Sequence, residues 1–362
     1  MKRFTLSSAA LALVASMAGA CTADIPSAAV PTDPALAKGG PSAATAYTVL
    51  DVGALLPGSP SQARGVNDAG DVVGFYASGS TSYPYAFVSG SPVTLGGGTG
   101  WAVGISNGDP VYVAGHVGLG AFNVPARWSL ADPTQPTYLA LAAGETFGFA
   151  NGVNDAGDAV GSVNSKAAMW LADGTRIPIT APAGFGNGEG RGIDNAGLAV
   201  FQFFGSPSGT ADRGYLRLAS GALIQMPPVG SDVLSFVNDL SEVTSNGLVF
   251  VAGSTNSGAR VSRAVRWTVD VATGAIVATS VLEKTGSHGL GVSDVGGIAG
   301  FFDTEGAARI ESFLWRGTTV LKLGPPKGTR DAFVWAFSRS GQYVAGYVHS
   351  AGRALRWTIA NP

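Results

Sequence analysis

Short apolar runs, each about the length of one strand, alternate along this chain with turn-forming clusters of Asn, Asp and Gly. The pattern is clearest at residues 65–74, Gly-Val-Asn-Asp-Ala-Gly-Asp-Val-Val-Gly, which return at residues 152–161 with one change. Asn and Asp side chains accept hydrogen bonds from nearby backbone amides, and Gly adopts a positive φ at no steric cost. Each copy therefore predicts a β-hairpin that turns at Asn-Asp-Ala-Gly.

Five looser copies of this hairpin occur along the chain, and their corresponding apolar positions are 39 to 55 residues apart. They begin at Gly104, Gly192, Phe236, Gly291 and Ala336, and the copy at Phe236 places its turn at Asn238-Asp239. A third apolar run in most copies ends in an aromatic residue, and a short fourth run follows. We expect five of these aromatic residues to lie in the core: Trp128, Trp170, Trp267, Trp315 and Trp357.

Four strands per copy and a period of about 40–50 residues are typical of a β-propeller. Seven copies predict an all-β, seven-bladed β-propeller of four-stranded antiparallel blades in one domain, residues 47–362. The seventh copy supplies only three strands, whereas residues 47–52 precede the first copy and belong to none. We expect this N-terminal strand to pair antiparallel with residues 354–359, as the outer strand of the last blade, and so to close the ring.

The N-terminal residues predict export and a lipid anchor. Lys2-Arg3 precede an uncharged apolar run at residues 9–20, which is too short to span a membrane as a retained helix. The following Ala18-Gly19-Ala20-Cys21 resembles the cleavage site of a bacterial lipoprotein signal peptide, with Ala18 where Leu is usual, and Cys21 is the only Cys. We expect residues 1–20 to be the signal peptide, Cys21 to carry lipid, and residues 21–46 to be a flexible Pro/Ala/Ser-rich tether. The alternative is an ordinary secretory signal cleaved nearby.

Composition fits an all-β repeat and argues against several classes of protein. The chain has 53 Gly and 20 Pro but only 13% charged residues, against about 25% in an average domain. A formal net charge of −2 without an Arg/Lys cluster predicts no attraction to nucleic acid or to anionic lipid. No later run is long and apolar enough for a transmembrane helix, so the lipid would be the only membrane attachment.

The repeat is similar to that of the HAF-repeat family of bacterial extracellular proteins. The resemblance rests on Gly-Val-Asn-Asp-Ala-Gly-Asp-Val-Val-Gly followed by a loop and Ala-Phe or Ala-x-x-Trp, and it spans most of residues 63–357. It implies β-propeller-like repeats outside the cell. The motif defines a repeat and no activity, so no catalytic residue is carried over from it.

Loop lengths predict a binding face. First-to-second-strand turns are tight, whereas second-to-third loops (residues 77–85 and 117–124 among them) and fourth-to-first loops are longer, and alternating strand direction places both longer classes on one face of the disc. Binding residues favour such loops on a rigid scaffold. Aromatic residues lie at the bases of these loops. Their rings could stack on sugar or peptide, or could pack between neighbouring blades, and for most of them we favour packing between blades. The candidate binding face consists of Tyr76, Tyr85, Trp101, His116, Phe147, Phe204, His288, Phe302, Tyr347 and His349.

The sequence contains no matched constellation of catalytic or metal-binding residues, so we predict no cofactor. His116, His288 and His349 lack metal-ligand spacing, although residues of different blades can converge on a propeller channel. Residues 67–71 and 154–158 resemble calcium loops only loosely, because the distal Glu is absent. The acids of the longer loops cannot be paired from sequence for glycoside cleavage; they are Glu145, Glu189, Asp303, Glu305 and Glu311.

The sequence therefore predicts an exported, lipid-anchored propeller in the cell envelope or on the cell surface. The leading hypothesis is a monomeric, non-enzymatic binding or scaffold module for an extracellular glycan or protein. The alternative is a propeller-type hydrolase or lyase that acts on polysaccharide, with acids and histidines converging over the channel. Two carboxylates and a His clustered on the long-loop face would favour the enzyme, and an aromatic-lined face without perturbed acids would favour the binder.

Overall fold

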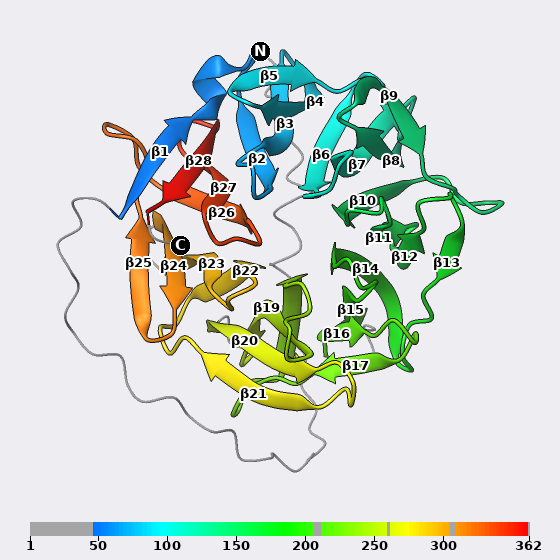
Figure 1. Cartoon of the computed structure of the whole chain (residues 1–362), viewed down its shortest axis with the longest axis vertical. Helices are drawn as coiled ribbons and strands as arrows, with labels where there is room; N and C mark the ends of the chain where they lie inside the picture. The colour runs from blue at the N-terminus through cyan, green and yellow to red at the C-terminus, as the bar shows by residue number, and fades with distance from the viewer. Residues whose placement is uncertain (1–45, 206–210, 259–260, 305–308, 361–362) are drawn as a thin grey trace, which may run out of the picture.

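The computed structural model describes residues 46–205, 211–258, 261–304 and 309–360. Within these ranges the chain forms 28 strands in seven four-stranded antiparallel sheets, which surround a central channel like the blades of a propeller (Figure 1). The prediction of an all-β, seven-bladed propeller is confirmed. No helix in the described ranges has the length and apolar character to cross a membrane. The expected signal peptide, Cys21 and the tether up to residue 45 lie outside the described residues.

Blades 1 to 6 take their strands in chain order from the channel to the rim. Blade 1 is β2 (Ser61–Val66), β3 (Val72–Ser78), β4 (Thr81–Val88) and β5 (Ser91–Thr94), and blade 2 is β6 (Gly100–Ile105), β7 (Tyr112–Leu119), β8 (Phe122–Ser129) and β9 (Asp132–Tyr138). Blade 3 is β10 (Gly148–Val153), β11 (Ala159–Val163), β12 (Lys166–Trp170) and β13 (Arg176–Pro178), and blade 4 is β14 (Phe185–Ile193), β15 (Ala199–Gly205), β16 (Arg213–Arg217) and β17 (Leu223–Met226). Blade 5 is β18 (Leu234–Leu240), β19 (Leu248–Asn256), β20 (Ser262–Asp270) and β21 (Ile276–Val281), and blade 6 is β22 (Ser287–Val292), β23 (Ile298–Thr304), β24 (Arg309–Arg316) and β25 (Thr319–Leu323).

Blade 7 joins the two ends of the described chain. It consists of β26 (Ala332–Phe337), β27 (Tyr343–Val348), β28 (Arg353–Ile359) and the N-terminal β1 (Tyr47–Asp51), which is followed by the 3-10 turn η2 (Val52–Leu55). β1 runs antiparallel to β28, with Tyr47 opposite Ile359. The backbone N–H of Gly324 in blade 6 donates to Tyr47 Oη at 2.7 Å. The predicted closure is confirmed, and β28 is not left as an open sheet edge.

The Asn-Asp-Ala-Gly turns form as predicted. Asn67 Oδ1 accepts from the backbone N–H of Asp71 at 2.9 Å, and Gly70 and Gly157 have φ of 78° and 88°. In every blade the residue in the Asn67 position accepts a backbone N–H across the turn with its side-chain oxygen. Ser replaces Asn in the looser copies because its hydroxyl makes the same bond. The seven residues are Asn67, Ser106, Asn154, Asp194, Ser241, Ser293 and Ser338.

The predicted turn at Asn238-Asp239 is wrong. Both residues lie within β18, at an irregularity between Val237 and Asp239. The chain turns instead after Ser241, whose Oγ accepts from the backbone N–H of Phe250 at 2.9 Å. Asn238-Asp239 has no Gly directly after it to supply a positive φ; the next one is Gly247, with φ of 74°.

The expected longer loops at residues 77–85 and 117–124 are also wrong. β3 continues to Ser78 and β4 begins at Thr81, and blade 2 has the same two-residue turn between Leu119 and Phe122. Gly79 and Gly120 supply a positive φ in these turns, so antiparallel pairing continues through residues that were predicted to form loops. Antiparallel pairing still places these turns and the fourth-to-first connections on one face. We call it the loop face and the opposite one, which carries the Asn67-type turns, the turn face.

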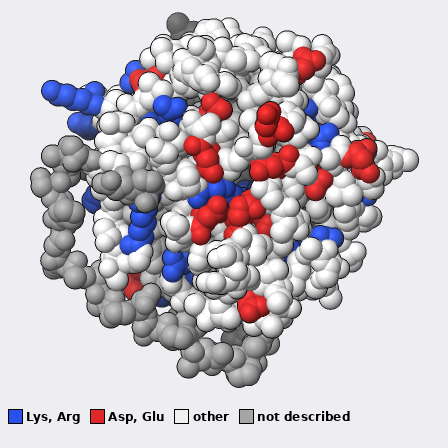
Figure 2. All heavy atoms as spheres, viewed as in Figure 1, with Lys and Arg blue, Asp and Glu red and all other residues white. Residues whose placement is uncertain are grey.

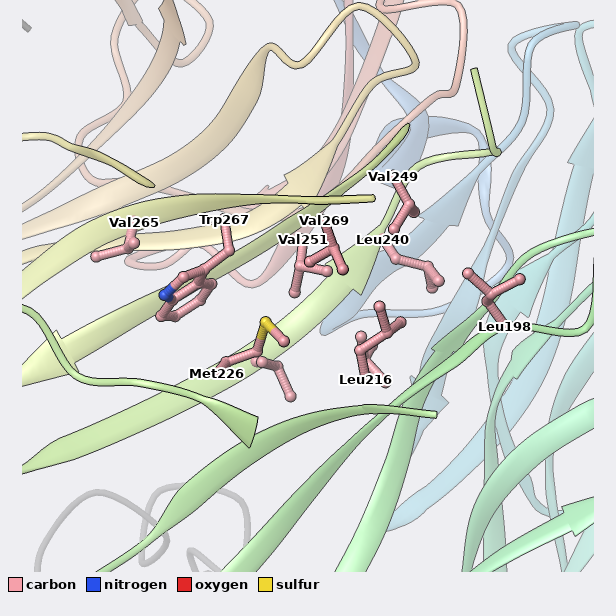
Figure 3. Packing of buried hydrophobic residues seen from close by; sticks show 11 residues of the cluster. Leu198, Leu216, Met226, Leu240, Val249, Val251, Val265, Trp267 and Val269 are labelled. Atoms are coloured by element: carbon pink, nitrogen blue, oxygen red, sulfur yellow. The ribbon is translucent and has the colours of Figure 1, made fainter. Parts of the chain in front are cut away.

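The core lies between neighbouring blades. Figure 3 shows the cluster between blades 4 and 5, where Trp267 packs with Met226 and Val265. Trp267 Nε1 donates to the carbonyl of Pro227 in the preceding blade at 3.1 Å. Trp128, Trp170 and Trp357 make the same bond to the blade before them, whereas Trp315 donates to Gly317 within its own blade. The predicted burial of the Trp set is confirmed: four are 0% exposed and Trp315 is 7% exposed.

Substitutions at two turn glycines can distinguish the cost of backbone strain from the cost of a steric clash. Gly70 and Gly197 share the same turn position, with φ of 78° and 79°. A Cβ at Gly70 would lie 2.9 Å from the Tyr343 ring, whereas nothing lies within 4 Å of one at Gly197. We expect Gly197→Ala to lower the free energy of unfolding by roughly 1–2 kcal/mol, the cost of a left-handed Ala, and Gly70→Ala to lower it by clearly more. Urea unfolding measures both, and equal losses would contradict the steric assignment.

Asp194 takes the position of the capping Asn residues, but its Oδ2 is buried without a hydrogen-bond partner among the described residues. The corresponding Nδ2 of Asn154 donates to the carbonyl of Asp194 in the next blade at 3.0 Å. We therefore expect Asp194→Asn to supply an analogous donor and to raise the free energy of unfolding at pH 7 by roughly 1 kcal/mol.

The gain should depend on pH. Burial raises the pKa of Asp194 to about 6 from a model-peptide value of 3.8. The folded form then binds the proton more tightly than the unfolded form, so this carboxyl costs stability as pH rises through that interval. The advantage of Asp194→Asn should shrink between pH 6 and pH 4. Unfolding curves of both proteins across this range test it, and a gain independent of pH would show that the buried charge is not its cause.

Candidate functional site

Every first strand carries an irregularity at the same place, next to the channel. In blade 1 it lies between Ala63 and Gly65, and the residue inside it points away from the regular pairing. The corresponding residue of each blade lines one central cavity of about 290 Å³. These seven bulge residues are Arg64, Val103, Asn151, Arg191, Asn238, Leu290 and Trp335.

The first strands approach one another closely around this cavity. A Cβ at Gly65 would lie 2.6 Å from the carbonyl oxygen of Val103 in the next blade, closer than real Cβ atoms come. Gly at the start of the repeat therefore lets neighbouring blades meet at the channel. The side chains of the seven bulge residues project into the channel and determine its polarity and charge.

A circle of hydrogen bonds surrounds the turn-face mouth of the channel. From blade 1 to blade 6, the backbone N–H of one turn donates to the side chain of the next, at 2.7 to 3.0 Å: Asp68 to Asn107, Asn107 to Asp155, Asp155 to Asn195, Asn195 to Glu242, and Glu242 to Asp294. Blade 7 completes the circle, because Asp294 N–H donates to the Arg339 carbonyl and Ser340 N–H donates to Asp68 Oδ1. The Asp of the repeat thus joins adjacent blades and is engaged by backbone groups.

Arg339 occupies the seventh position of this acidic circle, and its side chain reaches across the mouth. Its guanidinium lies 3.5 Å from Asp239 Oδ1 and 3.9 Å from Glu242 Oε1, both in blade 5, and donates to the carbonyl of Ile193 in blade 4 at 3.4 Å. Burial raises the pKa of Asp239 and of Glu242, and the charge of Arg339 opposes the rise. Figure 2 shows the acidic atoms gathered around the centre of the disc with basic atoms between them.

Aromatic rings form two arcs beside the cavity, and Trp101, His116, Phe149 and Trp335 of these arcs line it. In the first arc, Phe75 stacks on Trp101 at 4.6 Å between ring centroids, and the Trp101 and His116 rings are 5.5 Å apart. His116 then meets Phe149 edge-on at 4.9 Å. The second arc runs through His288, Phe301, Phe333 and Trp335, with successive centroids 4.3 to 4.6 Å apart.

Arg64 joins the two arcs. Its guanidinium carbon lies 4.0 Å from the Trp335 ring centroid and 5.2 Å from that of Trp101. These cation–π contacts contribute about 0.5–2 kcal/mol each. In the described ranges the guanidinium has no ion pair, and its buried Nε has no hydrogen-bond partner. Burial lowers the pKa of Arg64 to about 10, so the group stays charged at neutral pH.

Other channel polar groups differ in how they are paired. Arg191 forms an ion pair with Glu189 at 2.5 Å. The Nε1 of Trp335 and the Nδ1 of His116 are buried and, like Arg64 Nε, lack hydrogen-bond partners among the described residues. Burial lowers the pKa of His116 to about 4, and the Arg64 charge adds to this, so the imidazole is neutral at pH 7. The Arg64 side of the channel thus combines one unpaired cation with unused donors.

The structure brings together part of the predicted binding face. Trp101 and His116 line the cavity, and His288 begins the second arc. The Phe147 ring meets Phe149 edge-on, and Tyr347 Oη lies 3.2 Å from His349 Nδ1. The other four lie elsewhere: Tyr76, Tyr85 and Phe302 are buried in the clusters between blades, and Phe204 lies partly exposed on β15.

The predicted acids and histidines do not assemble into a metal site. Within the described part of the chain, no three His, Cys, Asp or Glu side chains are placed to hold a metal ion. Glu145 pairs with Arg176, Glu189 with Arg191, and Glu311 with Lys322. Glu305 lies outside the described residues. His288 and His349 stand at opposite ends of a series of ring contacts through Phe301, Phe333 and Tyr347, while His116 belongs to the other arc.

Sequence reasoning missed Arg64, Trp335, Phe333 and Arg339. A signal for the first two was present, because each directly precedes the residue that occupies the Gly65 position of its copy. The repeat is recognisable from the Gly65 position onward, whereas the residue at the Arg64 position differs from copy to copy and is not part of the motif. Its position in a bulge, which turns it into the channel, comes from the strand pairing.

No protein-family model matches the chain, and no curated protein matches its sequence. Among solved structures, the fold is similar to the β-propeller domain of Cps50 (Swd1) from Myceliophteria thermophila, with a TM-score of 0.51 and 11% identity over 87% of this chain and 99% of that one. It is also similar to virginiamycin B lyase from Staphylococcus aureus, with a TM-score of 0.52 and 10% identity over 87% of this chain and 99% of that one. At these identities the likeness concerns the fold alone.

Proposed function

We propose that this protein is a non-enzymatic binding module whose ligand enters the central channel from the loop face. The observation that carries the proposal is the unpaired Arg64 guanidinium, held between Trp335 and Trp101 beside a cavity of about 290 Å³. Small-molecule sites combine apolar and aromatic walls with a few convergent polar groups, and their volumes begin near ~300 Å³. The channel matches that description at its small end.

The two ends of the channel favour entry from one side. At the turn face, Arg339 and residues of the acidic circle line the cavity with side chains that are engaged by ion pairs or by backbone N–H groups. Toward the loop face, the partly exposed ring of Trp101 lines the cavity, and the partly exposed ring of Phe333 packs against the lining residue Trp335. Aromatic faces stack on sugar rings and on other planar groups. An extracellular glycan segment therefore fits the wall better than a large protein surface would.

A polysaccharide lyase is the second candidate, and one observation favours it. Tyr347 Oη lies 3.2 Å from His349 Nδ1, and the charge of Arg64 opposes the rise that burial causes in the pKa of Tyr347. In elimination from a uronate, a cation balances the carboxylate, a base takes the α proton, and the glycosidic oxygen leaves with its electron pair and is protonated. The rise in ultraviolet absorbance that accompanies an unsaturated uronate product would detect this activity.

For the same protein we propose export and lipidation at Cys21, and membership of the HAF-repeat family. The support is the sequence: a basic start, a short apolar run, the sole Cys at its end, and the repeat itself. A propeller tethered by an acyl chain would present its channel to ligands in the envelope or at the surface. The anchor proposal stands apart from the channel and is tested separately.

Binding in the channel is tested on a glycan array with residues 22–362, followed by titration of any ligand found. We expect Trp101→Ala to weaken binding by roughly 5- to 150-fold, because a stacked ring contributes roughly 1–3 kcal/mol. The matched control is Tyr138→Ala, an aromatic residue 48% exposed on the rim strand β9, which should bind like the unchanged protein. Equal losses in both variants, or binding unaffected by Trp101→Ala, would place the site elsewhere.

Lipidation is tested by Cys21→Ala in the full chain, expressed in a bacterium that processes lipoproteins. The unchanged protein should partition with membranes and carry an acylated N-terminal fragment in mass spectrometry, and the variant should lose both. Soluble, unacylated protein from the unchanged gene would reject the anchor. It would leave the channel proposal intact.

A further inference from the structure

We infer that the ligand of the channel is an acidic sugar, and that Arg64 selects it by pairing with the sugar's carboxylate. This deepens the proposed function, since it names the class of ligand for the same site and rests on binding there.

Arg64 differs from the other arginines that approach the channel. Arg191 pairs with Glu189 and Arg339 with Asp239 and Glu242. In the outer part of the blades, Arg356 donates to the carbonyl of Gly70 at 2.6 Å. Within the described ranges, Arg64 has no ion pair, and the rings of Trp335, Trp101 and Phe75 lie 4.0 to 6.0 Å from its guanidinium carbon. A partly buried charge without a partner is costly to keep, and an arriving anion would remove that cost.

The contacts that hold Arg64 leave its hydrogen-bonding edge unused. A guanidinium above a ring interacts through its flat face, whereas its five N–H donors lie in its plane. Arg64 Nε is buried without a partner, and so is Trp335 Nε1 in the ring that it covers. Buried donors in native proteins are normally satisfied. Arg64 Nε and Trp335 Nε1 are therefore available to donate to oxygen atoms of a ligand.

A carboxylate matches these donors better than a more highly charged anion. Guanidinium and carboxylate are both planar and form paired N–H···O bonds. The same cavity is lined by Asp155, Asp239 and Glu242, whose charges would repel a dianion such as phosphate. The single positive charge of Arg64 balances the single negative charge of a carboxylate. The aromatic arcs on either side offer faces on which the sugar ring that carries this carboxylate can stack.

The test measures binding of matched probes to residues 22–362 by calorimetry and Trp fluorescence. The probes are a galacturonate trimer, the corresponding neutral galactose trimer, benzoate, and inorganic phosphate. We expect the uronate to bind at least tenfold more tightly than the neutral trimer, with an affinity that falls as salt is raised. Benzoate separates a carboxylate on any ring from a carboxylate on a sugar, and it should bind more weakly than the uronate.

Two variants identify the selecting residue. Arg64→Gln should abolish the preference for the uronate while keeping the weaker affinity for the neutral trimer. Trp335→Ala should weaken both trimers, and the uronate more, because it removes a donor and the ring that holds Arg64. Thermal melting checks that each variant is folded; in Arg64→Gln the loss of the cation–π contacts and the removal of an unpaired charge change stability in opposite directions.

The outcomes separate the two levels of the proposal. Equal binding of acidic and neutral trimers, with Trp101→Ala weakening both, would overturn the inference and keep the channel site. Tighter binding of phosphate or benzoate than of the uronate would also overturn it. A uronate preference that survives Arg64→Gln would assign selection to another residue. Absence of binding by every probe and by the glycan array would remove the proposed function itself.

Discussion

The close approach of seven first strands around one channel is the constraint on which the rest of this structure depends. Each position of the repeat responds to it. Gly65 lets the neighbouring strand come within contact distance, Asn67 fastens the hairpin that turns back from the channel, and Asp68 receives a backbone N–H from the adjacent blade. Because every blade supplies the acceptor for its predecessor, the hydrogen bonds form a circle that stays complete only when all seven blades are present.

The ring of blades closes because this circle of hydrogen bonds requires a complete seventh blade. Blade 7 supplies Arg339 where the other blades supply an acid or amide, so the circle passes there through a backbone carbonyl and through Ser340. The N-terminal β1 completes that blade from the opposite end of the described chain. A sequence repeat with a period and a strand count is sufficient to predict this architecture, because turn chemistry is local and closure only requires counting strands. The two best copies predicted their turns correctly, with positive φ at Gly70 and Gly157.

The predictions failed where a tertiary contact replaced a local signal. Asn238-Asp239 has the dipeptide of the turn, but it lies in a bulged strand because Ser241 makes the capping bond that defines the turn. The predicted loops at residues 77–85 and 117–124 are strands, because a two-residue turn with Gly79 or Gly120 allows pairing to continue. For the candidate site, Trp101 and His116 could be named from sequence, whereas Arg64 could not. Its partners come from blades 2 and 7, and only the ring geometry brings them to the same side of the channel.

Architecture and chemistry are separated within single strands of this protein. The positions that must be small or must cap a turn recur in most copies, and they leave the bulge residue free to vary from Arg to Val, Asn, Leu and Trp. That freedom makes the two ends of the channel unlike each other. At the turn face, Arg339 pairs with Asp239 and Glu242, and backbone N–H groups engage the acids of the circle. At the loop face, no structural bond engages the polar groups of Arg64, Trp335 and His116 named above. A group that the fold does not use, yet holds in place with aromatic contacts, is available to a ligand, and for this reason the varied residues of the channel carry the functional argument.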